Sequence, residues 1–170
     1  MARRTDLRKF QEELSRRIAS ADSAVSAGRR LAFKAGSAAW LVALPDAGEV
    51  LPVPVLTAVP LTRAWVRGLA NVRGNLYTVV DLAAFAGSPA TLSGTRSRLL
   101  LVGQRHAMNA ALLVDAVVGL RGVGDLTARP AGASAQDWIK AVYADRDGTH
   151  WQELDVPALL QAASFLDVAA

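Results

Sequence analysis

The segment Asn71–Leu82, NVRGNLYTVVDL, decides the fold. Arg73 and Gly74 lie together between two apolar runs, and an asparagine stands on each side of the pair. Glycine adopts positive φ angles without steric cost, and asparagine side chains close turns by bonding to the backbone. The segment therefore predicts a β-hairpin with Arg73 at its tip. Asp81 ends the second apolar run and is expected to cap a short helix that follows.

Short apolar runs separated by turn residues extend this pattern along the chain and predict a mainly β fold. The run 49–56 contains prolines at positions 52 and 54, which remove backbone donors, so we expect this strand at a sheet edge. The loop 88–97 is rich in small residues and predicts a break between two small β lobes that share an apolar core. The remaining predicted strands are 38–44, 66–72, 76–82, 98–103, 108–117, 119–123, 137–145 and 149–155.

The N-terminal 35 residues differ from the rest of the chain in charge. They carry nine basic and four acidic side chains, whereas the net charge of the whole chain is only +4. The high isoelectric point therefore belongs to an N-terminal arm. We divide the chain into a basic helix and linker over 1–35 and a β domain over 36–170. A short C-terminal helix is predicted within 156–166.

Four apolar residues of the arm fall at helical spacing and form one stripe: Leu7, Phe10, Leu14 and Ile18. The interpretation that we favour is a helix that packs on the protein's own body. The alternative is docking on a partner or on anionic lipid through the arm's arginines. The arm lacks the apolar core of a signal peptide, and no run approaches the length of a membrane span, so we expect a cytoplasmic protein.

The chain offers little for catalysis. Cysteine is absent, so disulfides and thiolate chemistry are excluded. The two histidines have no neighbouring metal ligands, and we expect His106 and His150 to be exposed, with neither a metal nor a cofactor bound. Asp115 interrupts an apolar run, and we interpret it as a strand-end carboxylate that accepts backbone N–H groups. A protein that is not an enzyme is the better prediction.

If the protein binds partners, Arg73 can be given a chemical role. A guanidinium at a hairpin tip presents five donors to carboxylates or carbonyls of a partner. It could equally pair with an acid of the same chain and hold the hairpin in place. The chemistry of the residues alone leaves both interpretations open.

The segment 38–87 resembles the CheW-like adaptor domain of bacterial chemosensory systems. The resemblance is carried by Glu49-Val50, by Gly68-x-x-Asn71-x-Arg73-Gly74, and by Val79-Val80-Asp81-Leu82. It continues through LLVDAVVGLRGV at 112–123 and covers residues 36–165. Within the family, WVRGLANVRGNLYTVVDL and the basic arm are most similar to the PilI-type adaptors of twitching motility, which belong to type IV pilus systems.

This resemblance implies two five-stranded SH3-like barrels around a common core and no catalysis. It implies that the protein couples the cytoplasmic tip of a methyl-accepting chemoreceptor to the regulatory domain of a CheA-like histidine kinase. The receptor's helical hairpin is expected in the groove between the lobes, with Arg73 near that groove. The expected partner-binding residues are Arg73, Gly74, Asn75, Asn71, Glu49 and Val50.

A nucleic-acid-binding small barrel that uses the basic arm is the alternative function. It predicts binding that weakens strongly with salt. The predicted strands, however, lack an exposed face of aromatic and basic side chains on which bases could stack. The tryptophans are dispersed along the sequence and are expected to be packed. We therefore predict an adaptor that binds no nucleic acid and does not insert into the membrane.

Overall fold

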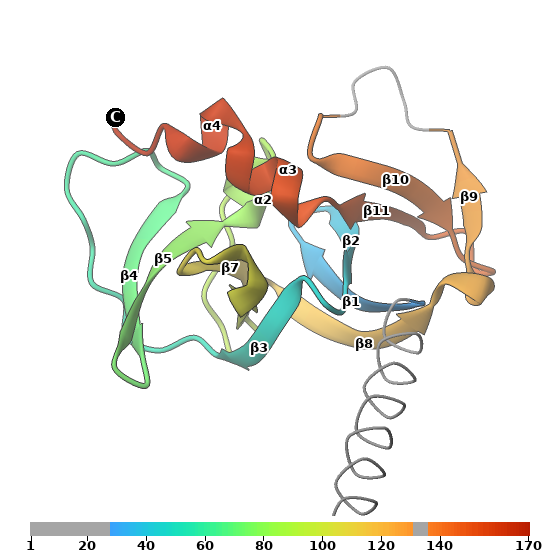
Figure 1. Cartoon of the computed structure of the whole chain (residues 1–170), viewed down its shortest axis with the longest axis horizontal. Helices are drawn as coiled ribbons and strands as arrows, with labels where there is room; N and C mark the ends of the chain where they lie inside the picture. The colour runs from blue at the N-terminus through green and yellow to red at the C-terminus, as the bar shows by residue number, and fades with distance from the viewer. Residues whose placement is uncertain (1–27, 131–135) are drawn as a thin grey trace, which may run out of the picture.

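A computed structural model describes residues 28–130 and 136–170 (Figure 1). Two mixed β-sheets make up the described part. Sheet A has the order β8-β1-β2-β11-β10-β9, and sheet B has the order β3-β6-β7-β5-β4. The strands of sheet A are β1 (Arg29–Ala35), β2 (Ala38–Ala43), β8 (Ala116–Gly122), β9 (Thr127–Arg129), β10 (Ile139–Ala144) and β11 (His150–Leu154). The strands of sheet B are β3 (Ala47–Pro52), β4 (Val66–Val72), β5 (Asn75–Asp81), β6 (Arg98–Val102) and β7 (Ala110–Val114).

The mainly β fold is confirmed, with one strand more than the resemblance implies, because the three-residue β9 adds an edge to sheet A. Most strand pairs are antiparallel, but β2 pairs with β11 and β5 pairs with β7 in parallel. Parallel pairs need long connections, so each joins segments that lie far apart in the sequence. As predicted from its prolines, β3 lies at an edge of its sheet.

The predicted break between lobes at 88–97 is wrong. That loop joins α2 (Leu82–Phe85) to β6, and both flanking strands, β5 and β6, belong to sheet B. The chain instead passes from sheet A to sheet B after β2 and returns at Asp115. A long polar loop is visible in a sequence, whereas a one-residue crossing inside an apolar run is not. Asp115 itself behaves as predicted, because its Oδ2 accepts the backbone N–H of Gly36 at 2.7 Å.

The start of the β domain also lies earlier than predicted. Residues 29–35 form β1, a strand of sheet A between β2 and β8, with four of its seven residues buried. Its two leading arginines resemble the basic arm in composition, so the prediction assigned the strand to the arm. The predicted helix with the apolar stripe, residues 5–20, lies outside the described residues.

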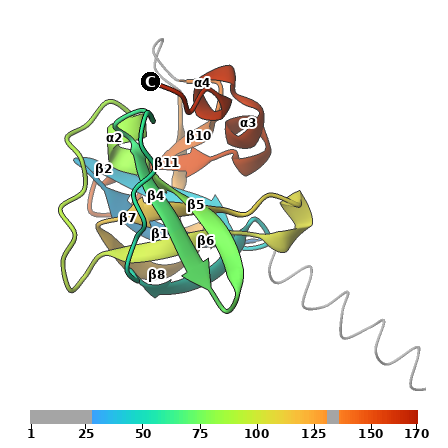
Figure 2. The ribbon, with the colours of Figure 1, turned by 90° about the vertical axis from the view of Figure 1, so that its left-hand side faces the viewer.

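The main core lies between the two sheets, where Leu, Val and Phe side chains of both meet. Phe33, Leu82, Leu112 and Leu159 are among its fully buried members. Two short helices, α3 (Val156–Gln161) and α4 (Ala163–Leu166), run along one side of the molecule (Figures 1 and 2). The sequence predicts one helix here, but Ala162 has an extended ψ of 126° and separates two. Two further turns are 3₁₀-helical, η1 (Gln104–His106) and η2 (Val123–Asp125).

Candidate functional site: a hairpin tip and a hollow between the sheets

The predicted hairpin is formed by β4 and β5, with Val72 opposite Asn75. Both central residues have positive φ, 51° at Arg73 and 87° at Gly74. Two positive values define the turn geometry that matches the twist of paired strands. The Asn71 side chain closes the turn, because its Oδ1 accepts the N–H of Gly74 at 2.9 Å. The turn is thus fixed by local chemistry, and it presents Arg73 to solvent.

The structure brings Arg73 next to Glu49 of the edge strand β3. The guanidinium Nη2 lies 2.6 Å from Glu49 Oε1, and the two side chains remain 77% and 42% exposed. An ion pair this exposed contributes at most about 1 kcal/mol to stability. Both interpretations of Arg73 therefore keep support, since it pairs within the chain and still offers free donors. Val50 is partly buried against the core, and Asn75 is exposed.

A hollow of about 1130 Å³ lies between the two sheets on the side of the short helices. Trp65, just before β4, and Phe85 of α2 line it on the side of sheet B, and Trp138 lines it just before β10 of sheet A. Ala158 and Ala163 line it from the C-terminal helices, while Arg63, Gln136, Asp137, Gln161, Ser164 and Asp167 make up most of its polar part. The hollow thus combines an aromatic floor with polar surroundings, as in surfaces that bind apolar side chains of a partner.

The aromatic floor is one connected chain of rings. Phe85 lies 5.1 Å from Trp65 and 5.5 Å from Trp138, measured between ring centroids. Trp138 stacks on Trp40 at 5.6 Å, and Phe165 of α4 stacks on Trp65 at 6.1 Å. These separations are typical of favourable aromatic pairs. The tryptophans are packed, as predicted, but three of them meet in one cluster, which their separation in the sequence did not indicate.

Arg73 lies away from this hollow. Trp65, which lines the hollow, precedes β4, and Arg73 follows the same strand. Seven residues of extended strand span roughly 23 Å at about 3.3 Å each. Arg73 is also absent from the residues that line the hollow. The hairpin tip and the hollow are two separate surfaces at opposite ends of sheet B.

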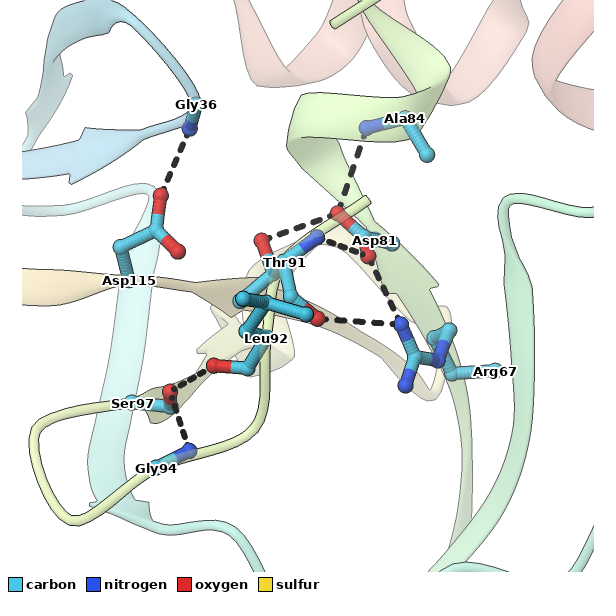
Figure 3. Close-up of polar contacts among 9 residues, drawn as sticks. All are labelled: Gly36, Arg67, Asp81, Ala84, Thr91, Leu92, Gly94, Ser97 and Asp115. Carbon is cyan, nitrogen blue, oxygen red and sulfur yellow. Dashed lines mark hydrogen bonds and ion pairs between the residues drawn. The ribbon is translucent and has the colours of Figure 1, made fainter. Parts of the chain in front are cut away.

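A buried carboxylate holds the loop 88–97 against sheet B (Figure 3). Asp81 is fully buried, and its Oδ2 accepts the N–H of Thr91 at 2.8 Å and the Arg67 guanidinium at 3.1 Å. Its Oδ1 accepts the Thr91 hydroxyl at 3.1 Å and the N–H of Ala84 at 3.2 Å. The predicted helix cap is therefore confirmed, and the same side chain also fixes the loop.

Two titratable groups, one in β10 and one in the turn that follows it, have shifted pKa values. The Trp151 indole N–H donates to Asp145 and, with backbone N–H groups of Thr149 and Asp147, holds the pKa of that carboxyl below its usual range. Burial, reinforced by the Glu153 carboxylate 3.0 Å away, raises the pKa of the Tyr143 hydroxyl. Glu153 is almost fully buried and pairs with Arg30 at 2.8 Å. These contacts lie away from both surfaces and stabilise sheet A.

The histidines do not form a metal site. Over residues 28–130 and 136–170, no three His, Asp or Glu side chains come together in a way that could hold a metal ion. His150 is exposed, as predicted, but the prediction for His106 is wrong. Its side chain is only 10% exposed, and its Nε2 lies 2.7 Å from Asp46. The partner is 60 residues away in the sequence, so the local context gives no sign of it.

Comparison with known proteins identifies the family. The CheW-like domain model matches residues 30–164, which include nearly every strand of both sheets. The chain belongs to the CheW-like family. CheW-like proteins act as scaffolds and adaptors, and the domain recognised here begins within β1, in agreement with the structure. No helix in the described part of this CheW-like chain is long and apolar enough to cross a membrane.

Two curated relatives cover most of the CheW-like chain. Protein PilI of Pseudomonas aeruginosa is 32% identical over 150 residues, which is 86% of this chain and 83% of PilI. Protein FrzA of Myxococcus xanthus is 31% identical over 135 residues, or 77% of this chain and 84% of FrzA. Among solved structures, the scaffolding protein TtCheW from Thermoanaerobacter tengcongensis has a TM-score of 0.66 at 20% identity. The match covers 81% of this chain and 94% of TtCheW, so the two proteins share a fold.

Proposed function

We propose that this CheW-like protein is a non-enzymatic signalling adaptor that couples a methyl-accepting chemoreceptor to a CheA-like histidine kinase. Membership of a scaffold and adaptor family supports the general class. Similarity to PilI and FrzA supports a role in motility signalling, and we propose control of type IV pili and twitching as its output. The protein works in the cytoplasm and is recruited to receptor arrays at the membrane.

The observation that carries the proposal is the separation of two surfaces. An adaptor must hold two partners at once, so its docking sites must not overlap. The hairpin tip and the aromatic hollow lie at opposite ends of β4, with the whole strand between them. A single rigid strand of a packed sheet keeps their spacing constant, which suits a protein that sets the geometry between two larger ones.

We assign the hairpin tip to the kinase. Arg73 is 77% exposed and is held by the Asn71 turn and by Glu49. The turn is ordered before binding, so little conformational entropy is lost when a partner's carboxylate or carbonyl accepts its guanidinium. The regulatory domain of a CheA-like kinase is the partner proposed for this surface, which also includes Asn75 and Val50.

We assign the hollow to the receptor. A helical hairpin docks by placing apolar side chains of successive turns in a groove. The ring chain from Trp65 through Phe85 to Trp138 offers such a floor, and Arg63 with Asp167 offers a polar edge. Most of the lining belongs to ordered secondary structure or to the core, so the groove exists before the receptor arrives.

Removing the guanidinium tests the hairpin-tip assignment. We expect Arg73→Ala to weaken kinase-domain binding at least about tenfold, because an exposed anchor is lost. The melting temperature should fall only slightly, since the Arg73–Glu49 pair is exposed. Calorimetric titration and thermal unfolding measure the two effects. Unchanged kinase and receptor binding with a strongly lowered melting temperature would show that Arg73 only holds the hairpin.

Filling the hollow tests the receptor assignment. Ala163 lines the hollow and is exposed, so Ala163→Trp adds bulk there without disturbing the core. We expect the affinity for a purified receptor-tip fragment to fall about tenfold or more, while kinase-domain binding stays the same. Ala90→Trp, at an exposed position of the loop 88–97, is the matched control and should change neither. Equal receptor binding by both variants would place the receptor elsewhere.

A further inference from the structure

Strand β3 contains a β-bulge at the residue that contacts Arg73. Gly48 and Glu49 together stand opposite a single residue of β6, because the register shifts by one between Ala47 and Val50. A bulge redirects the side chains around it, and bulges are common at sheet edges and next to functional sites. Both conditions apply here, since β3 is an edge strand and Glu49 forms the ion pair with Arg73.

The bulge decides which way Glu49 points. Ala47 and Val50 both pack against the main core. Side chains alternate between the two faces of a regular strand, so Glu49 would share the core face with Ala47 if the strand were regular. The extra residue reverses the alternation and leaves Glu49 exposed, with its Oε1 2.6 Å from Arg73 Nη2. The ion pair at the hairpin tip therefore depends on the bulge.

Only glycine fits at position 48. An added Cβ would lie 2.9 Å from the carbonyl oxygen of Leu101 and 3.1 Å from that of Val102. Both oxygens belong to the backbone of β6, and β6 is held between β3 and β7. A larger residue at position 48 would thus displace the bulge, and with it Glu49, rather than β6.

The start of β3 is fixed as well. The carbonyl of Asp46 accepts the N–H of Gly103 at 2.9 Å. Oδ1 of the Asp46 carboxylate lies 3.0 Å from Arg105 Nη2 and 2.7 Å from His106 Nε2. These contacts join the residue before β3 to η1 and to the residue that precedes it. An ordered backbone therefore leads into the bulge and directs Glu49.

The ion pair between Glu49 and Arg73 carries no net charge. The Glu49 side chain is 42% exposed, so a carboxylate of a partner would meet it as well as the guanidinium. Like charges placed side by side at an interface cost binding free energy. A carbonyl or carboxamide oxygen can accept the remaining donors of Arg73 without this repulsion. The charges at the tip thus favour an uncharged acceptor.

We propose that Gly48 and Glu49 are positioning residues of the hairpin tip, and that the tip binds an uncharged carbonyl or carboxamide oxygen of the kinase domain. This inference rests on the proposed function. Glu49 holds the Arg73 guanidinium in one orientation before the partner arrives, so less side-chain entropy is lost on binding. Gly48 acts through Glu49, because it permits the bulge that directs this side chain to Arg73.

The positioning role can be measured without a partner. The side-chain Nε–H signal of Arg73 in heteronuclear NMR reports the order of the guanidinium. Its heteronuclear NOE should fall in Glu49→Gln, in Gly48→Ala, and in Glu49→Asp, whose shorter side chain keeps the charge. Gly124→Ala is the matched control and should change nothing, since its added Cβ meets no atom within 4 Å. An unchanged NOE in both Glu49 variants, or in a folded Gly48→Ala, would overturn the positioning role.

Calorimetric titration with the kinase regulatory domain tests the chemistry of the bound group. We expect Glu49→Gln to bind about two- to fivefold more weakly than the wild type, because order is lost and no repulsion is relieved. Gly48→Ala should weaken binding by a similar factor. Combining the two substitutions should add little to either one, because both act on the same contact.

The outcomes are distinct. Tighter binding by Glu49→Gln would show that Glu49 competes with a carboxylate of the partner, and would overturn the assignment of an uncharged acceptor. Full additivity of the two substitutions would show that Gly48 does not act through Glu49. Absence of kinase-domain binding by the wild type would remove the proposed function and the bound group with it, whereas the NMR signal would still decide the positioning role.

Discussion

At the scale of single residues, Gly68 shows how one position permits a long connection to pack. Its φ is +121°, and a Cβ there would lie 2.2 Å from the carbonyl oxygen of Thr57. Thr57 and Leu69 exchange two backbone hydrogen bonds of 2.9 and 2.8 Å at this point. Only glycine lets the connection between β3 and β4 come this close, and that connection leads to Trp65, which lines the hollow.

Gly68→Ala should therefore destabilise the protein by about 2–4 kcal/mol, because both the clash and the backbone strain must be relieved by movement. Gly74→Ala is the control. Gly74 also has positive φ, 87°, but no atom lies within 4 Å of its added Cβ, so we expect a loss of only about 1 kcal/mol. Urea unfolding measures both. Equal losses would show that the close contact with Thr57 does not matter.

Tyr143 gives a pH dependence whose sign follows from its contacts. Burial and the Glu153 carboxylate raise the pKa of its hydroxyl above 10.0, so the unfolded chain releases this proton first. Its contribution to stability is complete below pH 10 and is lost as the pH rises through the folded-state pKa. The free energy of unfolding, followed in urea from pH 8 to 11, should fall less steeply in Tyr143→Phe than in the wild type. Identical slopes would contradict this account.

Contacts between residues that are close in the sequence could be predicted, whereas pairs of residues that are far apart in the sequence could not. The turn at Asn71 and Gly74 and the helix cap of Asp81 were predictable, because each depends on neighbours within three residues. The pairs Arg73–Glu49 and His106–Asp46 were not, since their members lie 24 and 60 residues apart. Only the folded sheets bring these partners together.

At the scale of elements, the end of β5 determines the position of three segments. Asp81 caps α2, accepts two hydrogen bonds from Thr91 and pairs with Arg67 of β4. Four donors thus converge on one buried carboxylate. Asp81 and the Arg67 guanidinium, which also donates to the carbonyl of Thr91 at 3.2 Å, hold the loop 88–97 against sheet B.

Asp81→Asn should cost about 2–4 kcal/mol, because an amide has one acceptor oxygen, leaves buried donors unsatisfied and removes the carboxylate that pairs with Arg67. Amide exchange at Thr91 should accelerate. Asp155→Asn is the control, because Asp155 caps α3 by accepting the N–H of Ala158, and asparagine caps equally well. Chemical denaturation with hydrogen exchange measures both. A loss from Asp81→Asn as small as from the control would contradict the role of this carboxylate.

Strand positions followed from the turn residues, but strand membership did not. Gly, Asn, Asp and Pro clusters delimit most strands correctly. The exceptions are instructive, since β1 was hidden by its arginines and the passage from β7 to β8 by the apolar residues around Asp115. In both cases composition indicated one continuous segment, whereas strand pairing divides it: β1 pairs with β2 and β8, and β7 pairs with β5 and β6.

At the scale of the whole molecule, aromatic rings join the two sheets. Trp40 belongs to sheet A, Trp65 and Phe85 adjoin sheet B, and Trp138 connects the two groups. The same rings stabilise the seam and form the floor of the hollow. The sequence predicted a shared apolar core but not this cluster, because its members come from β2, from α2 and from the connections before β4 and β10. The two proposed partner surfaces, one at each end of sheet B, therefore belong to a single packed unit.

The central claim is that two partners bind at once to separate surfaces. The most direct test is calorimetric titration of a receptor-tip fragment into the free protein and into its preformed complex with the kinase regulatory domain. We predict saturable binding in both titrations, with affinities within about threefold, and a complex of one copy of each component. Loss of receptor binding in the presence of the kinase domain would mean that the two partners compete for one surface, and would contradict the account.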